Sequence, residues 1–154
     1  MVAFSQVGPT RTFGLTVYVT QLSTDGEIEE LGATLKHKGP DALTSAMEDM
    51  KEKGRVAPAA SNGAAMEVVS IRPAKGGGQH IVLAGSRPIS VGEVRLNSRS
   101  RNYGFSIVVL NIDKDGKGTG TLAPACMLKF KKNELEVEHY GQKPLRLEGV
   151  KLEK

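Results

Sequence analysis

From about residue 64 to the C-terminus, apolar residues come in short segments separated by turn-forming residues, and helical spacing is absent. Segments of this kind, rich in Val, Ile and Leu, predict β-strands. Asp-Gly between two of them, within 113–118, favours a tight hairpin because glycine accepts the positive φ of the turn. Because the links are short, the strands are expected to be antiparallel. The expected strands are 66–71, 80–84, 103–112, 119–130 and 134–140, and residues 145–152 are expected to form a last strand pair or an edge strand.

The first part of the chain combines one strand with two short helices. Residues 10–22 alternate apolar and polar side chains, which predicts a strand. Thr24 and Glu27 have the spacing of a capping box, in which each side chain bonds the other's backbone amide, so a helix is expected to begin there. Pro40 suits the first position of a second helix, whose apolar spacing continues until Gly54.

We therefore predict an α+β fold, with a mostly antiparallel sheet of about seven strands and two short tandem helices near the N-terminal third. The chain has 154 residues, which is close to the common size of one domain, so residues 1–154 are expected to form a single domain. Its longest apolar runs have four residues, whereas a membrane-spanning helix needs about 18. No membrane span is therefore expected.

The cysteine and histidine content argues against several kinds of site. Cys126 is the only cysteine, which excludes an intramolecular disulfide and leaves a zinc site without its usual ligands. The three histidines, His37, His80 and His139, show no metal-ligand spacing. The aspartates of 113–115 lie between expected strands, which favours a turn over a calcium loop. We therefore expect no metal and no cofactor.

The densest basic stretch of the chain is a polar loop expected between two strands. Arginine side chains can bind phosphate or carboxylate groups through two parallel hydrogen bonds, and the neighbouring Ser and Asn residues add donors. The alternative is a solvated loop whose arginines pair with glutamates such as Glu93, Glu136 or Glu138. The residues proposed to line a ligand or partner surface are Arg87, Glu93, Arg99, Arg101 and Tyr103.

A small hydrolytic enzyme that uses a carboxylate with His139 is one alternative function. Glu138 precedes His139 in an expected strand, so the two side chains point to opposite faces, and the fold would have to supply a carboxylate such as Glu93. The chain has no Gly-x-Ser-x-Gly motif, and Cys126 lies in an apolar strand where an inert thiol is expected. No residue is therefore assigned a catalytic role.

A weak nucleic-acid or polyanion binder that uses the loop between Arg87 and Arg101 is a second alternative. The net charge is +4, from 21 basic and 17 acidic residues, which makes the chain only mildly basic. It has no Trp, 3 Tyr and 4 Phe, which gives little aromatic surface for stacking bases. Composition therefore argues against nucleic acid as the main partner.

Four landmarks follow one another along the chain: an Arg-Pro-Ile…Glu segment at 87–93, Tyr-x-Phe at 103–105, Gly-x-Gly within 116–120 and Glu-x-Tyr…Pro-x-x-Leu at 138–147. In this order they resemble an uncharacterised family of small bacterial proteins, which are often made with signal peptides. The resemblance runs from about Leu31 to the C-terminus, and it implies no activity, substrate or cofactor. It implies a periplasmic or secreted protein if a leader has been removed, and otherwise a cytoplasmic one. The family pattern more often has Asn where this chain has His139, which weakens a catalytic role for that imidazole.

Taken together, the residues and the resemblance predict a non-catalytic binding or interaction module of the bacterial envelope or exterior. Its expected partner is an anionic ligand or another protein. The arginine-rich loop is the expected contact surface.

Overall fold

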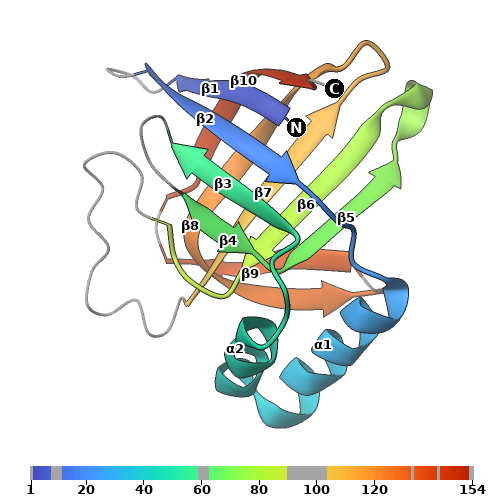
Figure 1. Ribbon diagram of the computed structural model, residues 1–154, viewed down its shortest axis with the longest axis vertical. Coiled ribbons are helices and arrows are strands. Elements are labelled where there is room, and N and C mark those ends of the chain that lie inside the picture. The colour runs from blue at the N-terminus through green and yellow to red at the C-terminus, as the bar shows by residue number, and fades with distance from the viewer. Residues whose placement is uncertain are drawn as a thin grey trace.

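The computed structural model describes residues 2–7, 12–58, 63–89, 104–132, 134–141 and 143–152, and its strands form one antiparallel sheet (Figure 1). The strand order is β4-β3-β2-β1-β10-β8-β7-β6-β5, and β9 pairs with the far end of β8. The predicted α+β class is confirmed, although the described residues form ten strands rather than about seven. The elements are β1 (Val2–Val7), β2 (Thr12–Val19), α1 (Asp25–Lys38), α2 (Pro40–Glu48), β3 (Gly54–Pro58), β4 (Ala64–Met66), β5 (Val68–Pro73), β6 (Gln79–Gly85), β7 (Phe105–Ile112), β8 (Lys117–Lys131), β9 (Glu134–Tyr140) and β10 (Leu145–Leu152), with a short 3-10 turn at Lys75–Gly77.

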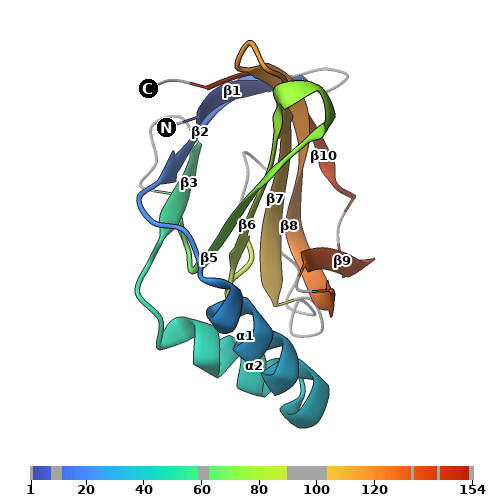
Figure 2. The same cartoon turned by 90° about the vertical axis from the view of Figure 1, so that its right-hand side faces the viewer.

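The sheet rolls up so that its two ends come together. β4 and β5 stand at opposite ends of the strand order, yet only Glu67 separates them in the chain. The backbone N–H of Glu67 donates to the carbonyl oxygen of Ala84 on β6, at 3.1 Å. Figures 1 and 2 show β2 and β3 on one side of the roll, β6 and β7 on the other, and both helices at one end.

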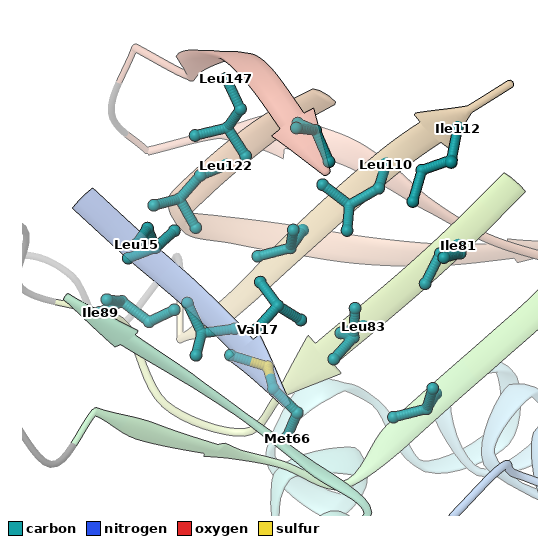
Figure 3. Close-up of a cluster of buried hydrophobic side chains, with 14 residues drawn as sticks. Leu15, Val17, Met66, Ile81, Leu83, Ile89, Leu110, Ile112, Leu122 and Leu147 are labelled. Atoms are coloured by element: carbon teal, nitrogen blue, oxygen red, sulfur yellow. The ribbon is translucent and has the colours of Figure 1, made fainter. Parts of the chain in front are cut away.

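Strands β5 to β8 are buried on both faces and therefore contribute to two cores. Leu83 packs with Leu110 and Leu122 in the core inside the roll (Figure 3). Val82, its neighbour, packs in a second core that includes Leu31 of α1. Successive side chains of a strand point to opposite faces, so an unbroken apolar segment fills both cores. Neighbouring residues that belong to different cores include Val68 and Val69, Val82 and Leu83, and Ile107 and Val108.

Helix α1 begins where the capping box predicts. The hydroxyl of Thr24 accepts from the N–H of Glu27 at 3.0 Å, and the N–H of Thr24 donates to the Glu27 carboxylate at 2.9 Å. Two of the amides that a helix start leaves without partners are thus satisfied. Pro40 is the first residue of α2, also as predicted. Within the described residues, no helix is both long and apolar enough to cross a membrane.

Helix α2 ends at Glu48, earlier than the predicted end at Gly54. Gly54 is instead the first residue of β3, where β3 and β2 approach closely. A Cβ atom on Gly54 would lie 2.5 Å from the carbonyl oxygen of Tyr18, which is too close for any side chain. This glycine is therefore required by strand packing and not by a helix end.

The hairpin between β7 and β8 confirms the predicted Asp-Gly turn. One carboxylate oxygen of Asp113 accepts from the N–H of Asp115 at 2.9 Å and from that of Lys117 at 3.0 Å. Gly116 has φ 82°, which glycine adopts without strain. The Asp113 side chain is thus an acceptor for the turn's own backbone.

Three strands were not expected from the sequence, and one was placed wrongly. β1 was not predicted, and the predicted connector at 55–63 contains β3 and leads into β4. β10 lies between β1 and β8, so it is not an edge strand. Its pairing with β8 shifts register between Leu147 and Val150, where Gly149 has φ 67°, which is typical of a β-bulge.

The double burial of the central strands leads to a stability prediction. Leu83 is fully buried in the core inside the roll, so Leu83→Ala is expected to lower the free energy of unfolding by about 2–5 kcal/mol. Leu22 is 48% exposed, so Leu22→Ala is expected to change that free energy by no more than about 0.5 kcal/mol. Urea denaturation of both variants checks this, and equal effects would contradict the assignment of the core.

Candidate functional site

A cleft of about 480 Å³ opens where the two ends of the rolled sheet meet. Its walls come from the turn after α2, from β4 and the bend that follows it, and from the segment after β6. Some of its lining is apolar, and the rest carries charge or hydroxyl groups. The polar residues of the lining are Glu48, Glu52, Glu67, Ser86 and Arg87.

Glu67 is the most buried charged residue of this cleft, with only 6% of its surface exposed. Its position follows from the bend between β4 and β5, which turns its side chain toward the segment after β6. One carboxylate oxygen of Glu67 accepts from the backbone N–H of Ser86 at 3.0 Å. A buried carboxylate therefore lines an open cleft and is held there by a fixed backbone donor.

Burial raises the pKa of the Glu67 carboxyl above its ordinary value. Hydrogen bonds from Ser86 act in the opposite direction, and the nearby charges of Glu48 and Arg87 respectively raise and lower the pKa. Loss of solvation is thus the largest effect, and the ionised form is less stable here than it is in water. A carboxyl with a shifted pKa in a cleft is a common mark of a functional site.

Lys53 is also buried, at 3% exposure, and it contacts the bend between β4 and β5. Its ammonium lies 3.2 Å from a carboxylate oxygen of Glu27 and donates to the backbone carbonyl of Glu67 at 3.2 Å. The pKa of Glu27 is lowered, first by the backbone hydrogen bond from Thr24 and also by Lys53. Lys53 therefore links the start of α1 to the bend. Because its ion pair is with Glu27, the Glu67 carboxylate stays available to a ligand in the cleft.

The segment after β6 is held by hydrogen bonds to its backbone at Arg87 and at Ile89. The hydroxyl of Ser106 donates to the carbonyl of Arg87 at 2.8 Å. The N–H of Ile89 donates to the carbonyl of Pro124 at 2.8 Å, and the Ile89 side chain is buried in the core inside the roll. Arg87 itself is exposed, so an anchored backbone carries a solvent-exposed arginine in the lining of the cleft.

The third carboxylate of the lining is already neutralised. Glu52 accepts two hydrogen bonds from Arg55, from Nε and from Nη2, both at 2.9 Å. Glu48 is exposed and forms no ion pair with another described residue. Glu48 and Glu67 are therefore the carboxylates that the cleft presents to a ligand.

A second surface groove, of about 540 Å³, lies between α1 and β8. Its charged side chains, among them Lys36, Lys129 and Lys132, are all exposed. Exposed lysines are most often simply solvated, so this groove has no feature comparable to the buried Glu67.

Of the residues predicted to line a site, Arg87 is placed in the cleft. Glu93, Arg99, Arg101 and Tyr103 lie outside the described residues. The sequence analysis missed Glu67 and Ser86. The available signal was a charged residue that interrupts the apolar segment at 66–71.

Glu138 and His139, the pair considered for a hydrolytic function, are both exposed. Glu138 and His139 are successive residues of β9, and no hydrogen bond or ion pair of the described residues joins them. The expected burial of Cys126 is confirmed, and the loss of solvation raises the pKa of its thiol to about 12.

The burial of Cys126 predicts that its thiol does not react in the folded protein. A thiolate is the reactive form, and at pH 8 a thiol with this pKa is protonated and out of contact with solvent. A disulfide reagent such as dithionitrobenzoate should release no chromophore from the native protein within minutes and one equivalent after denaturation in urea. Rapid reaction of the native protein would contradict the buried position.

No family model, no curated protein and no solved structure that was compared with the chain matches it. The family resemblance drawn from the sequence landmarks therefore stays a prediction.

Proposed function

We propose that this protein is a non-catalytic binding module whose cleft takes a small organic cation, through an ammonium or guanidinium group that meets Glu67. The observation that carries the proposal is the buried carboxylate of Glu67 in the wall of a 480 Å³ cleft. Pockets of about 300–1,000 Å³ with a few well-placed polar groups are typical of small-molecule sites.

The electrostatics of Glu67 favour a cationic ligand. Its carboxylate has lost much of its solvation, and its hydrogen bonds from Ser86 compensate only in part, since its pKa stays raised. A cation placed beside it would supply the missing stabilisation, and a charge-assisted hydrogen bond is roughly twice as strong as a neutral one. The nearby carboxylate of Glu48 adds to the attraction.

Binding accounts for these residues more simply than catalysis does. Ser86 holds Glu67 through its backbone amide, which fixes the carboxylate and suits recognition. The thiol of Cys126 is sealed in the second core. The proposal differs from the anionic ligand expected from the sequence, because the buried group in the described cleft is itself an anion. The bacterial envelope setting stays a prediction.

Titration with two amines tests the proposal. Agmatine carries a guanidinium and an ammonium, and cadaverine carries two ammonium groups, so both should bind saturably in calorimetric titrations at pH 7.5. Glu67→Gln keeps an acceptor for the Ser86 amide but removes the charge. It should lower the affinity for both amines at least tenfold. Glu138→Gln, on the exposed face of β9, serves as the control and should leave affinity unchanged. Absence of saturable binding, or equal binding by the Glu67→Gln protein, would count against the proposal.

The affinity for an amine is expected to depend on pH in a defined direction. The cation needs ionised Glu67, whose folded-state pKa lies above the ordinary 4.5. Affinity should therefore be constant above that pKa and should fall as pH drops through it, by up to about tenfold per unit, which is the limit for one competing proton. The same titrations repeated from pH 8 to pH 5 check this. The Glu67→Gln protein should lack this pH dependence. A rise in the affinity of the native protein for the amines on acidification would contradict the prediction.

A further inference from the structure

The lining of the cleft includes a positively charged side chain as well as the buried carboxylate of Glu67. Arg87 lines the same cleft as Glu67, and its backbone is held by the hydroxyl of Ser106 at 2.8 Å. We propose that the ligand is a zwitterion of the amino-acid type, with its ammonium or guanidinium group at Glu67 and its carboxylate at Arg87. This inference rests on the proposed function and names the chemical class of its ligand.

Arg87 differs from the other arginines that the structure describes. Arg55 pairs with Glu52, Arg72 lies 3.6 Å from Glu134, and Arg146 lies 3.1 Å from Glu148. Arg87 forms no side-chain hydrogen bond or ion pair with any described residue. Its guanidinium, which can bind a carboxylate through two parallel hydrogen bonds, is therefore available to a ligand on the described side of the cleft.

The two charges are close enough to interact but do not pair with each other. The charge of Arg87 lowers the pKa of Glu67, so the guanidinium acts on the carboxylate through space. No ion pair joins them. The chain connectivity keeps them near, because the Ser86 amide that holds the Glu67 carboxylate belongs to the residue next to Arg87. A molecule that carries both an ammonium and a carboxylate matches these two unpaired charges in one cleft.

The remainder of the lining suits the carbon skeleton of such a molecule. Met50, Ala64, Ala65 and Pro88 contribute apolar surface to the same cleft. Aliphatic carbon atoms of a ligand gain free energy when they leave water against such a surface. The cleft thus combines an acceptor, a donor and an apolar wall.

The test compares each amino acid with the amine that remains when its carboxylate is removed. Free lysine and cadaverine form one pair, and free arginine and agmatine form the other. Each amino acid should bind at least tenfold more tightly than its amine in calorimetric titrations at pH 7.5. Arg87→Gln should abolish that difference while the affinity for the two amines stays the same or rises slightly, because a competing positive charge has gone.

The controls separate this inference from the proposed function. Arg146→Gln removes an exposed arginine outside the cleft and should preserve the preference for amino acids. Thermal unfolding of Arg87→Gln should be close to that of the native protein, since the exposed side chain forms no hydrogen bond or ion pair with a described residue. If amines bind as well as the amino acids, or if Arg87→Gln keeps the preference, the zwitterion inference fails and the cation site stands. If none of the four compounds binds, both proposals fail.

Discussion

The burial of both faces of β5 to β8 is the constraint on which the rest of the structure depends. A sheet can bury two faces only if something covers each of them. Here the rolled sheet covers the inner face with its own β2 and β3, and helices α1 and α2 cover part of the outer face. The roll, the position of the helices and the short bend between β4 and β5 are all consequences of satisfying that one requirement.

The parts of the fold that depend on local chemistry were predictable. The reciprocal hydrogen bonds of Thr24 and Glu27 involve residues three apart, and the turn at Asp113 is closed by its own side chain. β1 depends on pairing with β10, from the opposite end of the chain, and no local pattern announces that pairing. Gly54 shows the same limit, because its role comes from the approach of Tyr18, thirty-odd residues away.

Of the two charged residues that carry the candidate site, Arg87 could be predicted from the sequence and Glu67 could not. Arg87 stood out because arginine is the residue best suited to bind carboxylates, and such a residue is noticeable wherever it lies. Glu67 did not, because a glutamate beside apolar residues is equally consistent with an exposed position at the end of a strand. Its burial results from the bend and from the amide of Ser86, and both depend on the strands having rolled into contact.

The position of Glu67 at the meeting point of the sheet's ends couples ligand binding to the integrity of the fold. Terminal strands have a neighbour on one side only, so the local openings of a sheet tend to start there. A molecule that contacts Glu67 and the segment after β6 at once would hold the two ends of the sheet together. Its binding free energy would then add to the stability of the closed roll, so that saturation by ligand would lower the fraction of molecules in which the two ends have separated.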